Sequence, residues 1–393
     1  MAIDIWWRIG MAGDPSSLRT AHRQSRGDWA PPGPDSITPG LRDGEPDGYG
    51  LLDYLVQTAR AAEGLGFHGG LLPSFPGTDD PWAVASALAR ETKTYKFMVA
   101  FQPGFLNPVQ AARMTASLHR ATGGRVTYNI ITGGGGPPQL WWGDKVAHDD
   151  RYARTSEFLD VLRGVWDGGP FDFDGRFYRV EGGGLPGPLA GLTFPEVYFS
   201  GSSPAAIEAA GRHADYYLSW LEPVEALRAK FDAVRARSLS PKFAVRVDVL
   251  ARETAEEAWA DIERGWRHVR PEAVRAQLSR DGGDSFGVRR AVSFQPESFT
   301  GFRDFEVAPN VFAGLALMRP GPAFGLVGSY EQVAERLDEL IDLGVDSLIL
   351  AGGPHLEEAY RVAEGVLPLL RGRLGEPAPQ HERGRTEPVT SSA

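Results

Sequence analysis

Two short segments place amide and hydroxyl side chains beside glycines, directly after runs of residues that favour β-strands. Glycine lets backbone amides approach an anion, and the N-terminus of a helix attracts a phosphate. Neither segment is a P-loop or a dinucleotide fingerprint, because the required lysine or glycine spacing is missing. Each alone also fits an ordinary turn or helix cap. The candidate phosphate contacts are Asn129, Thr132, Gly133, Ser200, Gly201, Ser202 and Ser203.

A third candidate site lies where a predicted helix begins. His148, Arg151 and Tyr152 offer an imidazole, a guanidinium and a phenol that could hydrogen-bond a phosphate. A charged helix start is more often simple capping, so this segment supports a binding site only in combination with the other two.

A possible substrate pocket is indicated by the strand predicted over residues 243–251. Alternate residues of a barrel strand point inward, so Arg246 and Asp248 share the inner face and could form a buried ion pair. Trp220 ends the neighbouring predicted strand, which favours a pocket there over a purely structural pair. Asp248 could also act as an acid or base.

Composition narrows the chemistry. The chain of 393 residues has no cysteine and a formal net charge of -10, which disfavours thiolate chemistry, nucleic-acid binding and attachment to anionic membranes. None of the eight histidines is spaced like a metal cluster, although His355 follows the last predicted strand and could bind a ligand or begin a helix. No targeting or membrane-spanning segment is evident, so we expect a cytoplasmic protein.

The predicted elements alternate between strand and helix, which is typical of a parallel sheet built from βα units. Eight such strands predict a closed α/β barrel occupying residues 1–374 as one domain. We expect insertions near residues 16–48, 171–192 and 268–326 and a disordered tail at 375–393. The predicted strands cover residues 3–9, 69–73, 96–101, 126–132, 197–200, 216–220, 243–251 and 347–351.

Several ordered motifs together resemble the bacterial-luciferase-like flavin-dependent monooxygenases, and most closely the two-component alkanesulfonate monooxygenases. The similarity extends over nearly the whole chain. The segments that carry it are residues 67–73, 128–133, 148–152, 171–178, 199–203 and 354–360.

This resemblance implies a (β/α)8 TIM barrel that uses reduced FMN and dioxygen to oxidise a small organic substrate, with organosulfur and sulfonate compounds among the candidates. A separate NAD(P)H-dependent flavin reductase would supply the reduced FMN, and homo-oligomers are usual. Asn129 and Thr132 would lie beside the isoalloxazine ring. The residues implied at the phosphate are Tyr152, Ser202 and Ser203, and those implied in the substrate pocket are Trp220, Arg246 and Arg319.

The pocket departs from its relatives at four positions. Thr78 replaces a cysteine, Ala12 and Asp248 replace histidines, and Gly353 replaces a tyrosine. We infer a bulkier, zwitterionic or less anionic substrate than an alkanesulfonate. Two alternatives remain: a deazaflavin-dependent dehydrogenase of the same fold, and a non-catalytic flavin-binding protein.

Overall fold

The structure is a computed structural model that describes most of the chain. Two predicted segments, the insertion at 16–48 and the tail at 375–393, lie outside the described residues, as do Arg319 and His268. The described residues are 3–13, 50–75, 78–237, 241–267, 269–272, 275–276, 279, 283–318, 324–370 and 372–374.

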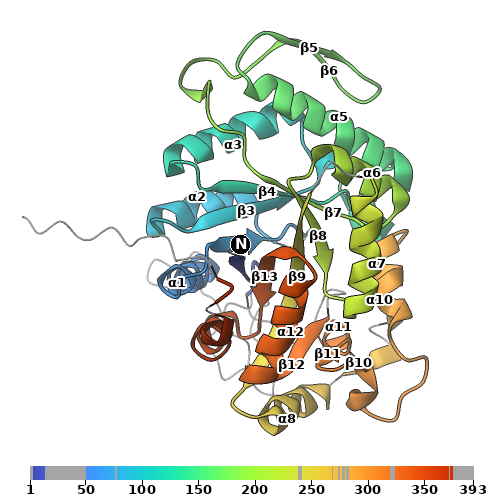
Figure 1. The fold of residues 1–393 in the computed structure, drawn as a ribbon. Helices are drawn as coiled ribbons and strands as arrows, with labels where there is room; N and C mark the ends of the chain where they lie inside the picture. The colour runs from blue at the N-terminus through green and yellow to red at the C-terminus, as the bar shows by residue number, and fades with distance from the viewer. Residues whose placement is uncertain are drawn as a thin grey trace, which may run out of the picture.

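Eight parallel strands close into a barrel, which confirms the predicted fold class (Figure 1). Each strand pairs with its neighbour in the ring, and closure comes from pairing of the seventh barrel strand with both the sixth and the eighth. All eight predicted strands are present. They are β1 (Asp4–Arg8), β2 (Gly69–Leu72), β3 (Lys96–Phe101), β4 (Val126–Ile130), β7 (Val197–Ser200), β8 (Tyr216–Trp220), β9 (Lys242–Arg252) and β13 (Val345–Ala351).

Helices surround this ring of strands and cover its outer face (Figure 1). Most begin with a side-chain cap or a proline in the first turn, the features that favour helix initiation. The helices that follow barrel strands are α1 (Leu51–Gly64), α2 (Pro81–Glu91), α3 (Pro108–Thr122), α5 (His148–Trp166), α6 (Pro204–His213), α7 (Val224–Arg235), α8 (Ala255–Trp266) and α13 (His355–Arg361), and α12 (Tyr330–Asp342) leads into the last barrel strand.

The sheet continues beyond the barrel from the second half of β9. There β12 (Gly325–Ser329) pairs in parallel with residues 248–252, and β10 (Glu306–Ala308) and β11 (Val311–Phe312) extend it further. The sequence analysis did not predict β12, because two of its five residues are glycine. Gly325 is explained by contact: a Cβ there would lie 2.1 Å from Leu315 Cδ1.

Side chains divide between the interior of the barrel and the layer beneath the helices. Trp6 belongs to a buried cluster with residues of the other strands, whereas the next residue, Trp7, packs against Phe67 in the layer between strands and helices. This alternation is the pattern expected of barrel strands. Within the barrel, Tyr198 stacks on Tyr216 with ring centroids 4.2 Å apart.

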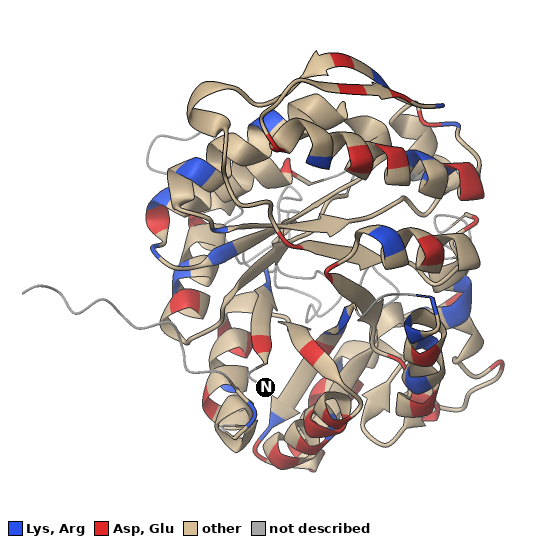
Figure 2. Cartoon of the chain, turned by 45° about the horizontal axis from the view of Figure 1, so that its top comes forward, with Lys and Arg blue, Asp and Glu red and all other residues tan. Residues whose placement is uncertain are grey.

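Two further elements stand outside the ring. The hairpin of β5 (Phe171–Asp174) and β6 (Arg179–Gly183) lies beyond α5 (Figure 1), and α10 (Phe286–Ser293) belongs to the segment that precedes β10. Charged residues gather on the outer helices, while the central strands carry few (Figure 2). Among the described helices, none is long and apolar enough to cross a membrane.

Gly69 gives a test of the close approach between β1, β2 and β3. A Cβ at Gly69 would lie 2.3 Å from the Lys96 carbonyl oxygen and 2.6 Å from Trp6 Cζ3. We expect Gly69→Ala to lower the free energy of unfolding by about 1–3 kcal/mol, because the buried strands cannot separate without cost. Gly64→Ala is the control, since no heavy atom lies within 4 Å of the added methyl and alanine favours the helix. Urea denaturation measures the free energy of unfolding of both variants. If Gly69→Ala were as stable as Gly64→Ala, the close packing at Gly69 would be contradicted.

His213 predicts a pH dependence of stability. Burial, with help from Arg212 and Arg163, lowers the pKa of His213 to about 4 from its ordinary 6.5. Between these pH values the unfolded chain takes up the proton first, so stability is retained above about pH 6.5 and falls by about 3 kcal/mol as the pH drops to 4.

The variant His213→Gln should lack this component of the pH dependence. Its free energy of unfolding should fall by about 3 kcal/mol less than that of the wild type between pH 7 and pH 4, measured by urea denaturation at each pH. Equal decreases in the two proteins would show that His213 is not the responsible group.

Candidate active site at the carboxyl end of the barrel

Two buried polar side chains, those of Asn129 and Thr132, lie at the end of β4. Asn129 alternates with Tyr128, which packs outward against Phe101, and so faces inward. Among the residues that the structure describes, neither Asn129 Oδ1 nor Thr132 Oγ1 has a hydrogen-bond partner. Buried polar atoms are nearly always paired, so these two indicate a ligand that completes their hydrogen bonds.

The turn after β4 is built for close approach of another group. Gly133 and Gly135 have φ angles of 100° and 72°, in the region that favours glycine. Gln139 supports the turn by accepting a hydrogen bond from the Gly135 amide at 3.0 Å. The sequence predicted this glycine-rich turn as an anion contact, and the structure shows that a carboxylate, that of Asp284, lies against it.

A second group of predicted residues meets where β7 runs into α6. Ser203 caps α6 and is buried, and a Cβ at Gly201 would lie 3.0 Å from the Tyr152 hydroxyl. Burial raises the pKa of Tyr152, while the neighbouring Ser203 hydroxyl and Arg151 lower it. Ser200 and Ser202 are half-buried beside them. The structure thus brings the start of α5 and the β7–α6 turn together.

His148 is placed differently from Tyr152, although both lie in the first turn or two of α5. Its Nδ1 atom lies 2.7 Å from the exposed carboxylate of Asp149, and its ring meets the edge of Tyr152 with centroids 5.2 Å apart. The imidazole therefore supports Tyr152 from the side.

The ion pair predicted on β9 is present. Arg246 Nη1 lies 3.0 Å from Asp248 Oδ2, and the two side chains are 10% and 6% exposed. Trp220 pairs with Arg246 in the register of β8 and β9. These three residues form one side of the barrel opening, and the cation is already compensated by a carboxylate.

Three charged residues that the sequence analysis missed meet at the end of β8. The buried carboxylate of Glu222 accepts hydrogen bonds from Lys230 Nζ at 2.5 Å and from Arg290 Nε at 2.9 Å. Burial lowers the pKa of Lys230, although Glu222 acts in the opposite direction. No local pattern joins residues 68 positions apart, so the sequence held no signal for this cluster.

Arg290 anchors α10 over Trp220. Gly287, one turn earlier in the helix, would place a Cβ 3.2 Å from Trp220 Cζ3. The same helix face therefore contacts Trp220 through Gly287 and Glu222 through Arg290. Arg8 was also missed, and alternation with Trp6 would have placed it on the inner face at the end of β1.

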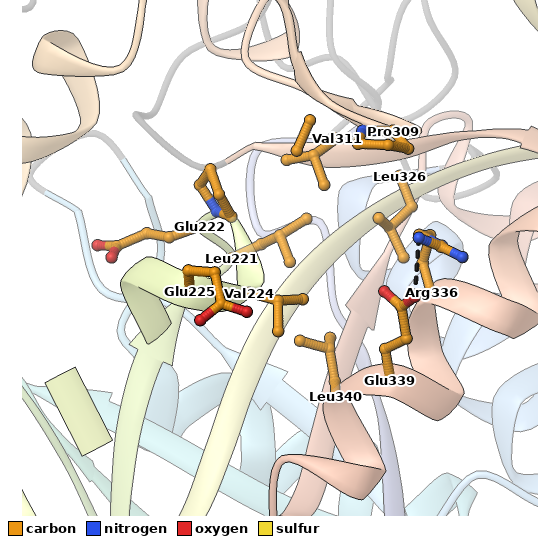
Figure 3. A pocket seen from close by; sticks show the side chains of 12 residues that line it. Leu221, Glu222, Val224, Glu225, Pro309, Val311, Leu326, Arg336, Glu339 and Leu340 are labelled. Atoms are coloured by element: carbon orange, nitrogen blue, oxygen red, sulfur yellow. Dashed lines mark ion pairs between the residues drawn. The ribbon is translucent and has the colours of Figure 1, made fainter. Parts of the chain in front are cut away.

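His355 packs against the segment after β1, and an apolar cavity lies outside the barrel. The His355 side chain packs at Gly10, where a Cβ would lie 2.2 Å from its Cδ2 atom, and the residue begins α13. A cavity of about 210 Å³ lies outside the barrel between α7, β11 and α12, with the carboxylate of Glu222 pointing away from it (Figure 3). None of the predicted site residues lines this cavity.

The ion pair of Glu222 with Arg290, which attaches α10 to the end of β8, can be tested through stability. We expect Glu222→Gln to lower the free energy of unfolding by about 3–5 kcal/mol, because it leaves the buried Lys230 cation without a carboxylate. The matched control, Glu225→Gln, alters an exposed pair with Arg228 and should change stability by less than about 0.5 kcal/mol. The stability of both variants is measured by thermal and urea denaturation. Similar stabilities would show that the buried Glu222 cluster does not stabilise the fold.

Comparison with known proteins supports one family. The family model described as "Luciferase-like monooxygenase" matches residues 36–347. Three solved structures share the fold: a riboflavin lyase (RcaE; 21% identity, TM-score 0.70, 95% of this chain and 93% of that chain), a long-chain alkane monooxygenase (LadA; 20%, 0.70, 95% and 92%) and an EDTA monooxygenase (EmoA) from Chelativorans sp. BNC1 (20%, 0.68, 95% and 94%). Because the family model covers most of its length, this chain belongs to the luciferase-like monooxygenase family.

Proposed function

We propose that this protein is a monooxygenase that uses reduced FMN and dioxygen to oxygenate a small organic substrate. A separate NAD(P)H-dependent flavin reductase would supply the reduced FMN. The observation that carries the proposal is the pair of buried atoms, Asn129 Oδ1 and Thr132 Oγ1, that lack partners among the described residues at the carboxyl end of a luciferase-like barrel.

The residues present fit a flavin mononucleotide. Asn129 and Thr132 would hydrogen-bond the polar edge of the isoalloxazine ring, and Tyr152, Ser202 and Ser203 would hold the phosphate. Because Gly201 has no side chain, the Tyr152 hydroxyl lies close to the backbone of the β7–α6 turn. Reduced FMN, when bound, supplies the electrons that activate dioxygen. Among the described residues, no group of three or more His, Cys, Asp or Glu could hold a metal ion.

The substrate proposal follows from charge at the barrel opening. Asp248 lies in an ion pair with Arg246, so among the described residues the charge of this guanidinium is compensated by a carboxylate. A fully anionic head group such as a sulfonate would compete with Asp248 for the guanidinium. A neutral or zwitterionic organic molecule can instead hydrogen-bond to both members of the pair and contact Trp220. Helix α10 would limit the entry of water above them, which favours oxygen transfer to the substrate.

The proposal is tested by supplying the protein with FMN, NADH and a flavin reductase, and then offering matched organosulfur substrates. We would use octanesulfonate, a neutral dialkyl sulfide and a zwitterionic sulfobetaine, with sulfite and oxygenated products quantified against a reaction without the protein. Oxygenated product from the neutral or zwitterionic compounds supports the proposal. Sulfite from octanesulfonate alone would support oxygenation but overturn the substrate assignment.

Thr132→Val should weaken binding of reduced FMN roughly five- to tenfold, since it removes one hydrogen bond of about 1 kcal/mol while preserving shape. Ser117→Ala is the control, because that hydroxyl bonds within its own helix at an exposed position. Anaerobic titration of each variant with reduced FMN measures the dissociation constant.

Hydride transfer from a reduced deazaflavin would instead favour a dehydrogenase. Retention of oxidised FMN without turnover would favour a flavin-binding protein.

A further inference from the structure

A carboxylate from the segment before α10 occupies the glycine-rich turn after β4. A Cβ at Gly135 would lie 2.1 Å from Asp284 Oδ1, and a Cβ at Gly283 would lie 2.3 Å from the Gly136 amide nitrogen. Residues 283–284 therefore pack directly on the turn. Only the lack of a side chain at Gly135 lets the carboxylate come this close.

The positive partner of Asp284 is Arg151, which is buried at the start of α5. Arg151 donates from Nη2 to Asp284 Oδ1 at 2.7 Å and from Nη1 to the Val146 carbonyl at 3.0 Å. Its side chain is 4% exposed, whereas that of Asp284 is 45% exposed. Arg151 Nε is buried and has no partner among the described residues. The cation is thus a fixed part of the site, and the anion reaches it from the solvent side.

This pair adjoins the space proposed for the flavin phosphate. Arg151 precedes Tyr152 in α5. The pKa of Tyr152 is raised mainly by burial; the charge of Arg151 lowers it and that of Asp284 raises it, so both charges lie near this hydroxyl. A phosphate monoester beside Tyr152 and Ser203 would carry negative charge close to the Asp284 carboxylate. The phosphate and the Asp284 carboxylate would repel each other, because both are negative. The Arg151 guanidinium can bind either of these anions.

We propose that Arg151 and the glycine-rich turn form an anion subsite, which the Asp284 carboxylate occupies in this structure and which the phosphate of reduced FMN takes over. This inference rests on the proposed flavin function and adds to it a competition between cofactor and carboxylate. Flavin binding would release residues 283–284 from α5, while Arg290 and Glu222 keep α10 attached to β8. Phosphate binding thereby frees residues 283–284 from α5, while α10 keeps its place over the barrel opening.

The test compares reduced FMN with reduced riboflavin, which lacks the phosphate. Anaerobic titrations would give the dissociation constant of each flavin for the full-length protein. Asp284→Asn removes the competing charge and should tighten FMN binding about five- to tenfold, with less than twofold effect on riboflavin. Arg151→Gln should weaken FMN binding about tenfold or more, again with little effect on riboflavin.

Arg290→Gln is the matched control, because it loosens the same segment without altering the subsite. It should leave the ratio of FMN to riboflavin affinity unchanged. If Arg290→Gln reproduced the effect of Asp284→Asn, or if Asp284→Asn changed both flavins equally or neither, the competition would be disproved.

A second measurement uses the wild-type protein and inorganic phosphate. Phosphate should compete with FMN but not with riboflavin, relative to chloride at equal ionic strength, and should compete more strongly in Asp284→Asn. Binding of riboflavin as tightly as FMN would overturn the subsite and leave the flavin function standing. Failure to bind either flavin would overturn the proposed function itself.

Discussion

Closure of the barrel depends on the pairing of one long strand. The first half of β9 hydrogen-bonds to β8 on one side and to β13 on the other, and without these two ladders the sheet would remain open. The same pairing fixes which side chains of β9 face inward. It therefore decides that Arg246 and Asp248 meet beside Trp220 at the opening. The second half of β9 leaves the ring and carries β12, which begins the sheet extension next to the site.

That extension and the segment before it form one side of the opening, and two ion pairs, at Asp284 and at Arg290, hold the segment there. The two contacts differ in physical character. Glu222 is buried with Lys230 and Arg290, so separating its charges exposes cations that water cannot easily reach. Asp284 is half-exposed, so another anion can replace it at low cost. The Glu222–Arg290 contact would therefore hold α10 at β8, while the Arg151–Asp284 contact could exchange with a phosphate, as we propose.

Much of the fold was predictable because its signals are local. The eight barrel strands are short β-branched or aromatic runs, and the helices between them carry caps and apolar spacing that any chain of this sequence would favour. The missed strand β12 shows the limit of this reasoning. Its glycines disfavour a strand locally, but Leu315 and the Asp248 main chain require the small residue there, and pairing with β9 supplies the missing stability.

For the site, the sequence by itself determined the polar groups at the strand ends and the alternation that pairs Arg246 with Asp248. These follow from the period of a strand and from the rule that parallel strands end at one edge. Only the tertiary structure decided that Asp284 meets Arg151 and that Glu222 meets Arg290, because 133 and 68 residues separate the partners. Contacts of this kind depend on how a long segment folds back over the barrel, and no local preference encodes that path.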